Sequence, residues 1–406
     1  MIEFIMNKLR HNLEISSLQS ATNDIRNRCS QLKNRELACD MGIDIRKNKI
    51  KDLPIKVIGI VIFIFGISQT FSSDIQSHCL NCLNKKSIVD ETKYPGFCTI
   101  FCITKGNSVF FGNNEDWKNP NTFIWVERPT DSTYGVVYLG FEDLFPQGGI
   151  NEKGLAFDAN ALPGIRLKEH RELLKPYQTI VNTYIMQKCA TVGEAIEMAK
   201  SYDWSQSFGG ILRGQFLLAD AAGDAVVISS DQNGEIVFTR KPQGDGYLVS
   251  TNFNRAFPDN KFGSGQCWRY ETATNMLDKF IKENSISTDL LVNVLDAVHQ
   301  EGNSLNTLYS NIFDLKQGII YLYHWHQFDQ EVLIKVSDWM NSEPGTIRIE
   351  SLFNEETVSK ANEEYKSYQN RKKKIFIIIT LTLLALTLII YLFRKKIFVH
   401  KAKSDW

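Results

Sequence analysis

The chain has 406 residues, with 46 basic and 46 acidic side chains and therefore no formal net charge. Hydrophobic residues make up 43% of it and charged residues 23%, which is typical of a globular protein and excludes a disordered, collagen-like or low-complexity chain. A neutral chain has no global basic field to attract phosphates, so we expect no nucleic-acid partner.

The first apolar segment, Val57–Ile67, has eleven residues and no charge. A helix of that length spans about 16 Å, which is short for a bilayer but typical of a signal-peptide core. We therefore expect residues 1–73 to be an N-terminal extension that carries a signal peptide or an uncleaved signal anchor. A buried core helix is the alternative. The long polar stretch before the segment leaves Met41 as an alternative start.

Between residues 98 and 340 the pattern indicates one α+β domain. The apolar runs CTIFCITK and SVFFGNN are joined by the turn signal Lys105-Gly-Asn107 and predict a hairpin. A second, closing hairpin is predicted from TLYSNIFD and GIIYLYHW. Before it, the runs QFLLADAA, DAVVISSD, EIVFTRK and GYLVSTN are separated by glycine turns and predict a meander.

Helices are expected between these groups of strands. Residues 168–190 have a helical pattern, and Thr191-Val-Gly-Glu194 resembles a capping box that opens a further helix. Two amphipathic helices are expected near residues 273–282 and 289–299, the second capped by Ser287. Strand blocks separated by helix blocks favour helices packed on antiparallel sheets.

The C-terminal region has the pattern of a membrane anchor. Residues 341–374 are polar and are expected to form a helical stalk. The next nineteen residues, Ile375–Phe393, carry no charge. As a helix they span about 28 Å, close to the thickness of a hydrocarbon core. We expect a transmembrane helix there, followed by a basic tail over 394–406. Basic flanks on both sides leave its orientation open. With a signal peptide upstream, the domain would lie outside the cytoplasm, at the cell surface or in a secretory or lysosomal lumen.

Cys98 is the candidate nucleophile. A single unpaired thiol is commonly a buried structural cysteine, which is the alternative interpretation. A nucleophilic thiol needs a base, and cutting the Phe97–Cys98 bond would provide one. The freed α-amine has an ordinary pKa of about 7.7–8.0, which suits a base at neutral pH. The bond lies far beyond any signal-peptide site. Residues 74–97 would therefore be a propeptide, removed by the chain itself or by another protease.

Five sequence motifs from Cys98 onward occur in the same order as in a known family. After Cys98-Thr-Ile-Phe come GNNEDW at 112–117, QGGINEKGL at 147–155, Ser250-Thr-Asn252 and Cys267-Trp-Arg-Tyr270, and then the closing hairpin. Over residues 98–335 the chain resembles the N-terminal-nucleophile (Ntn) linear amide hydrolases. This family includes choloylglycine hydrolases, penicillin V acylases and penicillin acyltransferase-like proteins.

The resemblance implies a four-layer αββα sandwich of antiparallel sheets. It also implies self-cleavage by the Cys98 thiol, and hydrolysis of a linear amide of an N-acylated small molecule through a Cys98 thioester, without a cofactor. It assigns Asp116 to the amine of the nucleophile, Asn252 and Asn160 to the oxyanion, and Arg269 to electrostatic support of the site. The structural alternatives are a capping carboxylate for Asp116, a turn residue for Asn252 and a solvated helix start for Arg269.

One position departs from the choloylglycine hydrolases. Their word GRNxDW has an arginine where this chain has Asn113, and asparagine cannot lower the pKa of a thiol by its charge. Bile-salt specificity is therefore in doubt, and the word GNNEDW is closer to the acyltransferase-like proteins. The alternatives to a hydrolase are an acyltransferase that uses the same acyl-enzyme and an inactive, membrane-anchored binding protein. Retention of Cys98, Asp116 and Asn252 together favours an enzyme.

Two other patterns are weaker. Cys79-Leu-Asn-Cys82 is a single C-x-x-C that suits a redox-active pair or half of a zinc site, but the sequence has no second pair, and in the secretory pathway a disulfide is favoured. His324 and His326 alternate along a strand and are interpreted as a strand surface rather than a metal site. We expect no metal.

Overall fold

The computed structural model describes residues 98–175, 181–205, 211–257, 267–283, 285–302, 305–341 and 345–404. The apolar segment at 57–67, the propeptide predicted over 74–97 and the Cys79–Cys82 pair lie outside the described residues. These three interpretations stay predictions.

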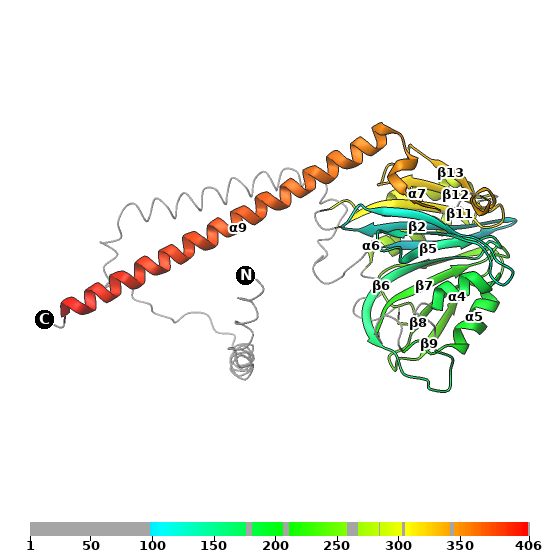
Figure 1. Cartoon of the computed structure of the whole chain (residues 1–406), viewed down its shortest axis with the longest axis horizontal. Helices are drawn as coiled ribbons and strands as arrows, with labels where there is room; N and C mark the ends of the chain where they lie inside the picture. Colours follow the sequence, from blue (N-terminus) through cyan, green and yellow to red (C-terminus); the bar gives the residue numbers. More distant parts are fainter. Residues whose placement is uncertain are drawn as a thin grey trace. The chain divides into compact units, whose positions relative to one another are not determined.

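The described strands form two antiparallel sheets (Figure 1). The first sheet has the order β10-β1-β2-β11-β12-β13 and the second has the order β14-β3-β4-β5-β6-β7-β8-β9. The strands of the first sheet are β1 (Thr99–Lys105), β2 (Ser108–Trp117), β10 (Gly246–Ser250), β11 (Asn306–Asp314), β12 (Ile319–His324) and β13 (Val332–Lys335). The strands of the second are β3 (Thr122–Glu127), β4 (Val136–Phe141), β5 (Pro146–Asn151), β6 (Ala156–Arg166), β7 (Ile211–Ala219), β8 (Ala225–Ser230), β9 (Ile236–Arg240) and β14 (Thr346–Arg348).

Each sheet is covered on both faces. Successive side chains of a strand point to opposite sides, so one strand contributes to the apolar clusters on both faces. In β1, Ile100 and Cys102 join the core between the two sheets, whereas Phe101 and Ile103 join the cluster under α6 (Trp268–Phe280) and α7 (Thr288–Val298). The outer face of the second sheet packs against α4 (Val181–Lys188) and α5 (Val192–Ser201). The prediction of helices packed on antiparallel sheets is confirmed.

Several local predictions are also confirmed. The first hairpin is β1–β2, and its turn contains Gly106 at φ 57°. The closing hairpin is β11–β12. Thr191 caps α5 by accepting the backbone N–H of Glu194, and Ser287 caps α7. These features depend on neighbouring residues alone, which is why the sequence pattern predicts them.

The helix expected over 168–190 is wrong in its first part. Residues 167–175 are irregular, and the described helix α4 covers Val181–Lys188. Lys168 and His170 contact the carboxylate of Glu235 at 2.6 and 2.8 Å, which holds this segment against the turn between β8 and β9. Pro176 follows in the sequence, and helical backbone dihedral angles are disfavoured at the residue before a proline.

The predicted meander is wrong at its last strand. Strands β7, β8 and β9 are neighbours in the second sheet, but β10 pairs with β1 of the first, with Ile100 opposite Ser250. Gly244 and Gly246 have φ values of 78° and 154°, which L side chains rarely adopt, so this loop can turn the chain toward the other sheet. The crossing brings Asn252 to the end of β1 where Cys98 lies.

The segment expected to be a stalk belongs partly to the domain. Strand β14 pairs with β3, and after α8 (Val336–Met340) and a short 3-10 helix (Ile349–Leu352) the chain enters α9 (Glu355–Ser404). The first turns of α9 pack on the first sheet, where Trp325 Nε1 donates to Glu364 Oε2 at 2.9 Å.

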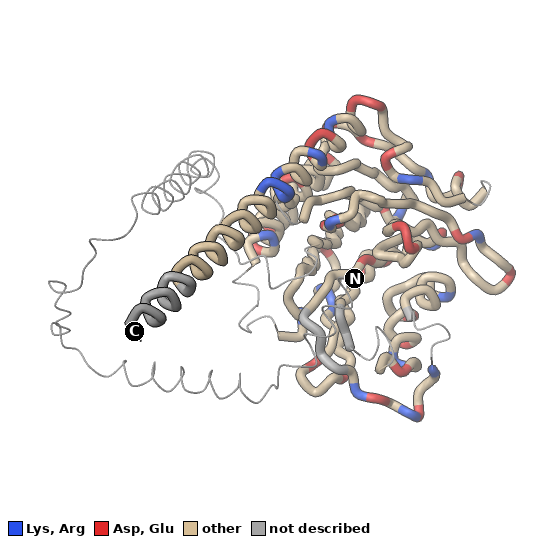
Figure 2. Tube along the Cα trace, turned by 60° about the vertical axis from the view of Figure 1, so that its left-hand side comes forward, with Lys and Arg blue, Asp and Glu red and all other residues tan. Residues whose placement is uncertain are grey.

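Farther along, α9 extends away from the two sheets (Figure 1). The large apolar side chains over Ile375–Phe393 are mostly exposed. Charged residues lie along its first turns and are absent from this stretch (Figure 2). Within the described ranges, α9 is the one helix long and apolar enough to cross a membrane, with a mean hydropathy of 2.8 over its most apolar window.

Gly154, in the turn between β5 and β6, gives a stability prediction. Its φ is +80°, and an added Cβ would lie 2.3 Å from the backbone carbonyl oxygen of Leu315. We expect Gly154→Ala to lower the free energy of unfolding by about 1–3 kcal/mol for overpacking, plus about 1–2 kcal/mol for left-handed backbone. Denaturant unfolding measures the change.

Gly193→Ala in α5 is the matched control, because the nearest atom to its added Cβ lies 3.8 Å away. Alanine in a helix is favoured over glycine, so this variant should be slightly more stable than the wild type. Equal effects of the two substitutions would contradict the assignment of Gly154 to a strained close contact.

Candidate active site

Cys98 lies directly before β1 and is 5% exposed. Its Sγ donates to Glu115 Oε1 at 3.5 Å. The contact follows from the β1–β2 register, since Thr99 pairs with Asn114 and an antiparallel pair therefore sets Cys98 against Glu115. The thiol is consequently a buried group that faces a carboxylate.

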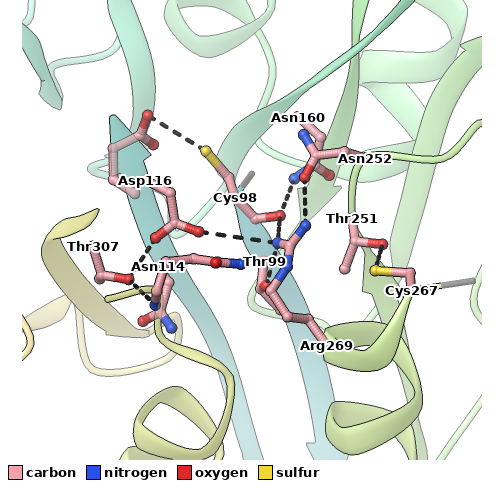
Figure 3. Close-up of polar contacts among 12 residues, drawn as sticks. Cys98, Thr99, Asn114, Asp116, Asn160, Thr251, Asn252, Cys267, Arg269 and Thr307 are labelled. Atoms are coloured by element: carbon pink, nitrogen blue, oxygen red, sulfur yellow. Dashed lines mark hydrogen bonds and ion pairs between the residues drawn. The ribbon is translucent and has the colours of Figure 1, made fainter. Parts of the chain in front are cut away.

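Arg269 in the first turn of α6 connects the parts of the site (Figure 3). Its Nη1 donates to the Cys98 carbonyl at 2.8 Å and to Thr99 Oγ1 at 2.9 Å, while its Nη2 donates to Asn252 Oδ1 at 2.9 Å. Nη1 also lies 4.0 Å from Asp116 Oδ2. Arg269 is 3% exposed, so the alternative of a solvated helix-start arginine is wrong. A buried guanidinium with an acidic partner holds α6, β1 and the residues after β10 together.

Asp116 is buried and has one carboxylate oxygen with a hydrogen-bond partner and one, called the open oxygen below, without one in the described part of the chain. Thr307 Oγ1 donates to Oδ1 at 2.5 Å, and Oδ2 has no hydrogen-bond partner among the described residues. Burial raises the pKa of Asp116 to about 7, although the charge of Arg269 and the Thr307 hydrogen bond oppose the shift. The open oxygen of Asp116 can accept a hydrogen bond from a cationic amine.

The two predicted oxyanion asparagines donate to backbone carbonyls. Asn160 on β6 donates from Nδ2 to the Cys98 carbonyl at 3.0 Å, and its Oδ1 accepts from Ser250 Oγ. Asn252 donates from Nδ2 to the Ala161 carbonyl at 2.8 Å. Asn252 is 8% exposed and lies in a bend shortly after β10, so it is a turn residue whose side chain is buried in the site. The structure brings all five predicted site residues into one cluster: Cys98, Asp116, Asn160, Asn252 and Arg269.

Two carboxyl groups in this cluster were not predicted from the sequence. Glu115 and Asp158 are 2% and 1% exposed. Burial raises the pKa of Glu115 to about 8, and the negative charge of Asp116 acts in the same direction. Burial and the charge of Glu115 raise the pKa of Asp158 well above its usual range. The signal for Glu115 was a charged residue inside the buried strand GNNEDW; Asp158 is visible only from the packing of β6.

The same surroundings keep the thiol protonated. Burial raises the pKa of Cys98 well above its ordinary value, and the charges of Glu115, Asp116 and Asp158 raise it further. The thiol is therefore not a nucleophile at neutral pH unless a base accepts its proton as the new bond forms.

The two histidines do not share a strand face. His324 ends β12 and is buried, which lowers its pKa to about 4, so its interpretation as a surface residue is wrong. Trp325 has φ 57° and turns the chain, and His326 then pairs with Glu364 at 3.1 Å. Within the ranges given above, no three His, Cys, Asp or Glu side chains are grouped so that they could hold a metal ion.

Comparison with known proteins gives the following similarities. The family model described as acyl-coenzyme A:6-aminopenicillanic acid acyl-transferase matches residues 103–329. Two structures of the conjugated bile acid hydrolase from Clostridium perfringens are similar. A cysteine-to-alanine mutant has 16% identity, a TM-score of 0.48 and coverage of 62% of this chain and 96% of that one. An arginine-to-leucine variant has 17% identity, a TM-score of 0.46 and coverage of 62% and 97%.

Penicillin V acylase from Agrobacterium tumefaciens is similar at 17% identity and a TM-score of 0.44, with coverage of 56% of this chain and 82% of that one. No curated protein matches the chain.

The buried carboxyls predict how stability depends on pH. The pKa of Glu115 is about 8 in the folded chain, against an ordinary value near 4.3, so the folded state holds the proton more tightly. Its contribution to stability is complete below about pH 4 and is lost as the pH rises through about 8, by up to about 1.4 kcal/mol per pH unit.

Glu115→Gln should therefore flatten the fall of the unfolding free energy between pH 5 and 8. Glu197→Gln, at an exposed position of α5, is the control and should leave the slope unchanged. Denaturant unfolding at several pH values measures both. A Glu115→Gln slope equal to that of the wild type would show that Glu115 is ionised throughout this range.

Proposed function

This chain belongs to the acyl-coenzyme A:6-aminopenicillanic acid acyl-transferase family, among the Ntn amide hydrolases and acyltransferases, and on that premise we propose that it is a self-activating cysteine amide hydrolase. The observation that carries the proposal is the set of contacts around Cys98. Its carbonyl accepts from Asn160 and Arg269, and Arg269 also lies beside the open carboxylate oxygen of Asp116. The two covered antiparallel sheets agree with the αββα sandwich of the Ntn enzymes.

The proposed reaction begins with cleavage of the Phe97–Cys98 bond by the Cys98 thiol. Cys98 then carries an α-amine whose ordinary pKa, about 7.7–8.0, suits a general base. The amine takes the thiol proton as Sγ attacks the substrate carbonyl, and it returns the proton to the leaving nitrogen. Water hydrolyses the thioester. The open oxygen of Asp116 would accept a hydrogen bond from the amine when it is protonated.

The remaining residues would hold this geometry. Asn160 and Arg269 fix the carbonyl of Cys98, which limits rotation of the nucleophile. Asn252 orients the guanidinium of Arg269 through its Oδ1. For the oxyanion role that the resemblance implies, the Asn252 amide would exchange the Ala161 carbonyl for the substrate oxygen.

The proposed substrate is a linear amide of an N-acylated small molecule. An acyltransferase that uses the same Cys98 thioester is the second candidate, and the description of the matching family model favours it. The two activities differ in the acceptor of the acyl group, which is water for a hydrolase and an amine for a transferase. Adding candidate amines to the reaction and following the acylated product separates them.

Processing at Cys98 is the main test of this function. The mature chain should begin at Cys98, and Cys98→Ala should stay uncut because it lacks the attacking thiol. N-terminal sequencing and intact mass measure both. Cys102→Ala removes a second buried thiol from β1 and should be cut like the wild type. Active protein that retains an intact bond before Cys98 would contradict the mechanism.

We further propose that α9 anchors the domain in a membrane, with the domain on the extracytoplasmic side. The uncharged, exposed stretch Ile375–Phe393 supports the anchor. In sealed vesicles with the cytoplasmic side outward, added protease should leave the domain intact, and carbonate should not extract the protein. Digestion of the domain would contradict the orientation, and release by carbonate would contradict the anchor.

A further inference from the structure

The α-amine of Cys98 cannot assist the first cleavage of the chain. Before that cleavage its nitrogen is an amide of the bond to be broken, and an amide nitrogen is not a base. The thiol is nevertheless buried and protonated, because burial and three nearby carboxyls raise its pKa. Self-cleavage therefore needs a proton acceptor that is present in the uncut chain.

Glu115 is placed to be that acceptor. Among the described residues it is the one carboxylate in hydrogen-bond contact with Cys98 Sγ, at 3.5 Å from Oε1. Its other oxygen, Oε2, accepts from Asn113 Nδ2 at 3.4 Å, which turns Oε1 toward the thiol. The antiparallel β1–β2 register imposes this approach on the folded chain before any cleavage.

We propose that Glu115 is the catalytic base of self-cleavage, a role that ends when the Cys98 amine is released. The inference rests on the proposed function. The thiol proton passes from Sγ to Oε1 as Sγ bonds to the carbonyl carbon of residue 97. The tetrahedral oxyanion collapses, the bond from that carbon to the Cys98 nitrogen breaks, and Glu115 returns the proton to the nitrogen. Water then hydrolyses the thioester, which leaves a carboxyl group on residue 97 and restores the thiol.

The surroundings of Glu115 make its carboxylate a stronger base than an exposed glutamate. Asp116 is its neighbour on β2. Asp158 on β6 and Tyr309 on β11 lie close enough for the charge of Glu115 to raise their pKa values, and the Tyr309 hydroxyl has no hydrogen-bond partner among the described residues. The single guanidinium of Arg269 pairs with Asp116. Burial and the negative charge of Asp116 raise the pKa of Glu115 to about 8, so its carboxylate is a stronger base than usual. A new ammonium group at Cys98 would then reduce that basicity after the cut.

The test measures cutting and acylation separately in the full chain. Residues 92–97 are replaced by a recognition sequence for a site-specific protease that cuts directly before Cys98, so that mature protein can be made without self-cleavage. Self-cleavage of the natural precursor is followed by intact mass. Acylation of Cys98 in the externally cut protein is followed by the burst of 4-nitrophenolate from 4-nitrophenyl acetate, with Cys98→Ala as the background.

Glu115→Gln should cut itself at least about 10²-fold more slowly than the wild type, the usual effect of losing a general base. In the externally cut protein, Glu115→Gln should reduce the acylation burst by a much smaller factor than it reduces the rate of self-cleavage. Glu115→Asp, which keeps a carboxylate, should recover part of the cutting rate. The wild-type cutting rate should rise with pH through about 8.

The outcomes separate this inference from the proposed function. Normal self-cleavage of Glu115→Gln would overturn the role of Glu115, as would equal losses in cutting and acylation. A wild-type chain that does not cut itself but is acylated after external cutting would also overturn it and leave the amidase chemistry standing. A wild-type chain that shows neither reaction would remove the proposed function and this inference together.

Discussion

The buried guanidinium of Arg269 is the contact on which the geometry around Cys98 depends. It joins the carbonyl of Cys98, the hydroxyl of Thr99 and the side chain of Asn252, which come from parts of the chain more than 150 residues apart. A buried positive charge is stable only with an acidic partner and filled hydrogen bonds, and Asp116 provides that partner. Helix α6 is therefore held to β1 by charge as well as by apolar packing.

Around this contact the protein buries more negative than positive charge. The charge of Asp116 adds to burial in raising the pKa of Glu115, and the charge of Glu115 does the same for Asp158. Burial and the charges of all three carboxyls raise the pKa of the Cys98 thiol. Such a site resists forming a thiolate and favours the addition of a positive charge. Release of the α-amine of Cys98 would add that charge at this place, so the same electrostatics that suppress the free thiolate would favour the processed chain.

The parts of the fold that were predicted correctly are those that neighbouring residues determine. The hairpin at Gly106, the cap at Thr191 and the cap at Ser287 each depend on a few adjacent side chains. The prediction failed where distant contacts decide. The segment around His170 is irregular because it is tied to Glu235, and β10 leaves the meander because its hydrogen-bonding partner is β1.

The sequence by itself determined the first and closing hairpins, the capped helices, the apolar stretch of α9 and the order of motifs from Cys98 to Arg269. The tertiary structure decided which polar groups meet. The alternation of side-chain direction along a strand indicates which face of the sheet a residue lies on, but not which strand of the other sheet lies opposite it. For that reason Asp158 on β6 could not be linked to Glu115 on β2, nor Asn160 to the carbonyl of Cys98, until packing placed the two sheets face to face.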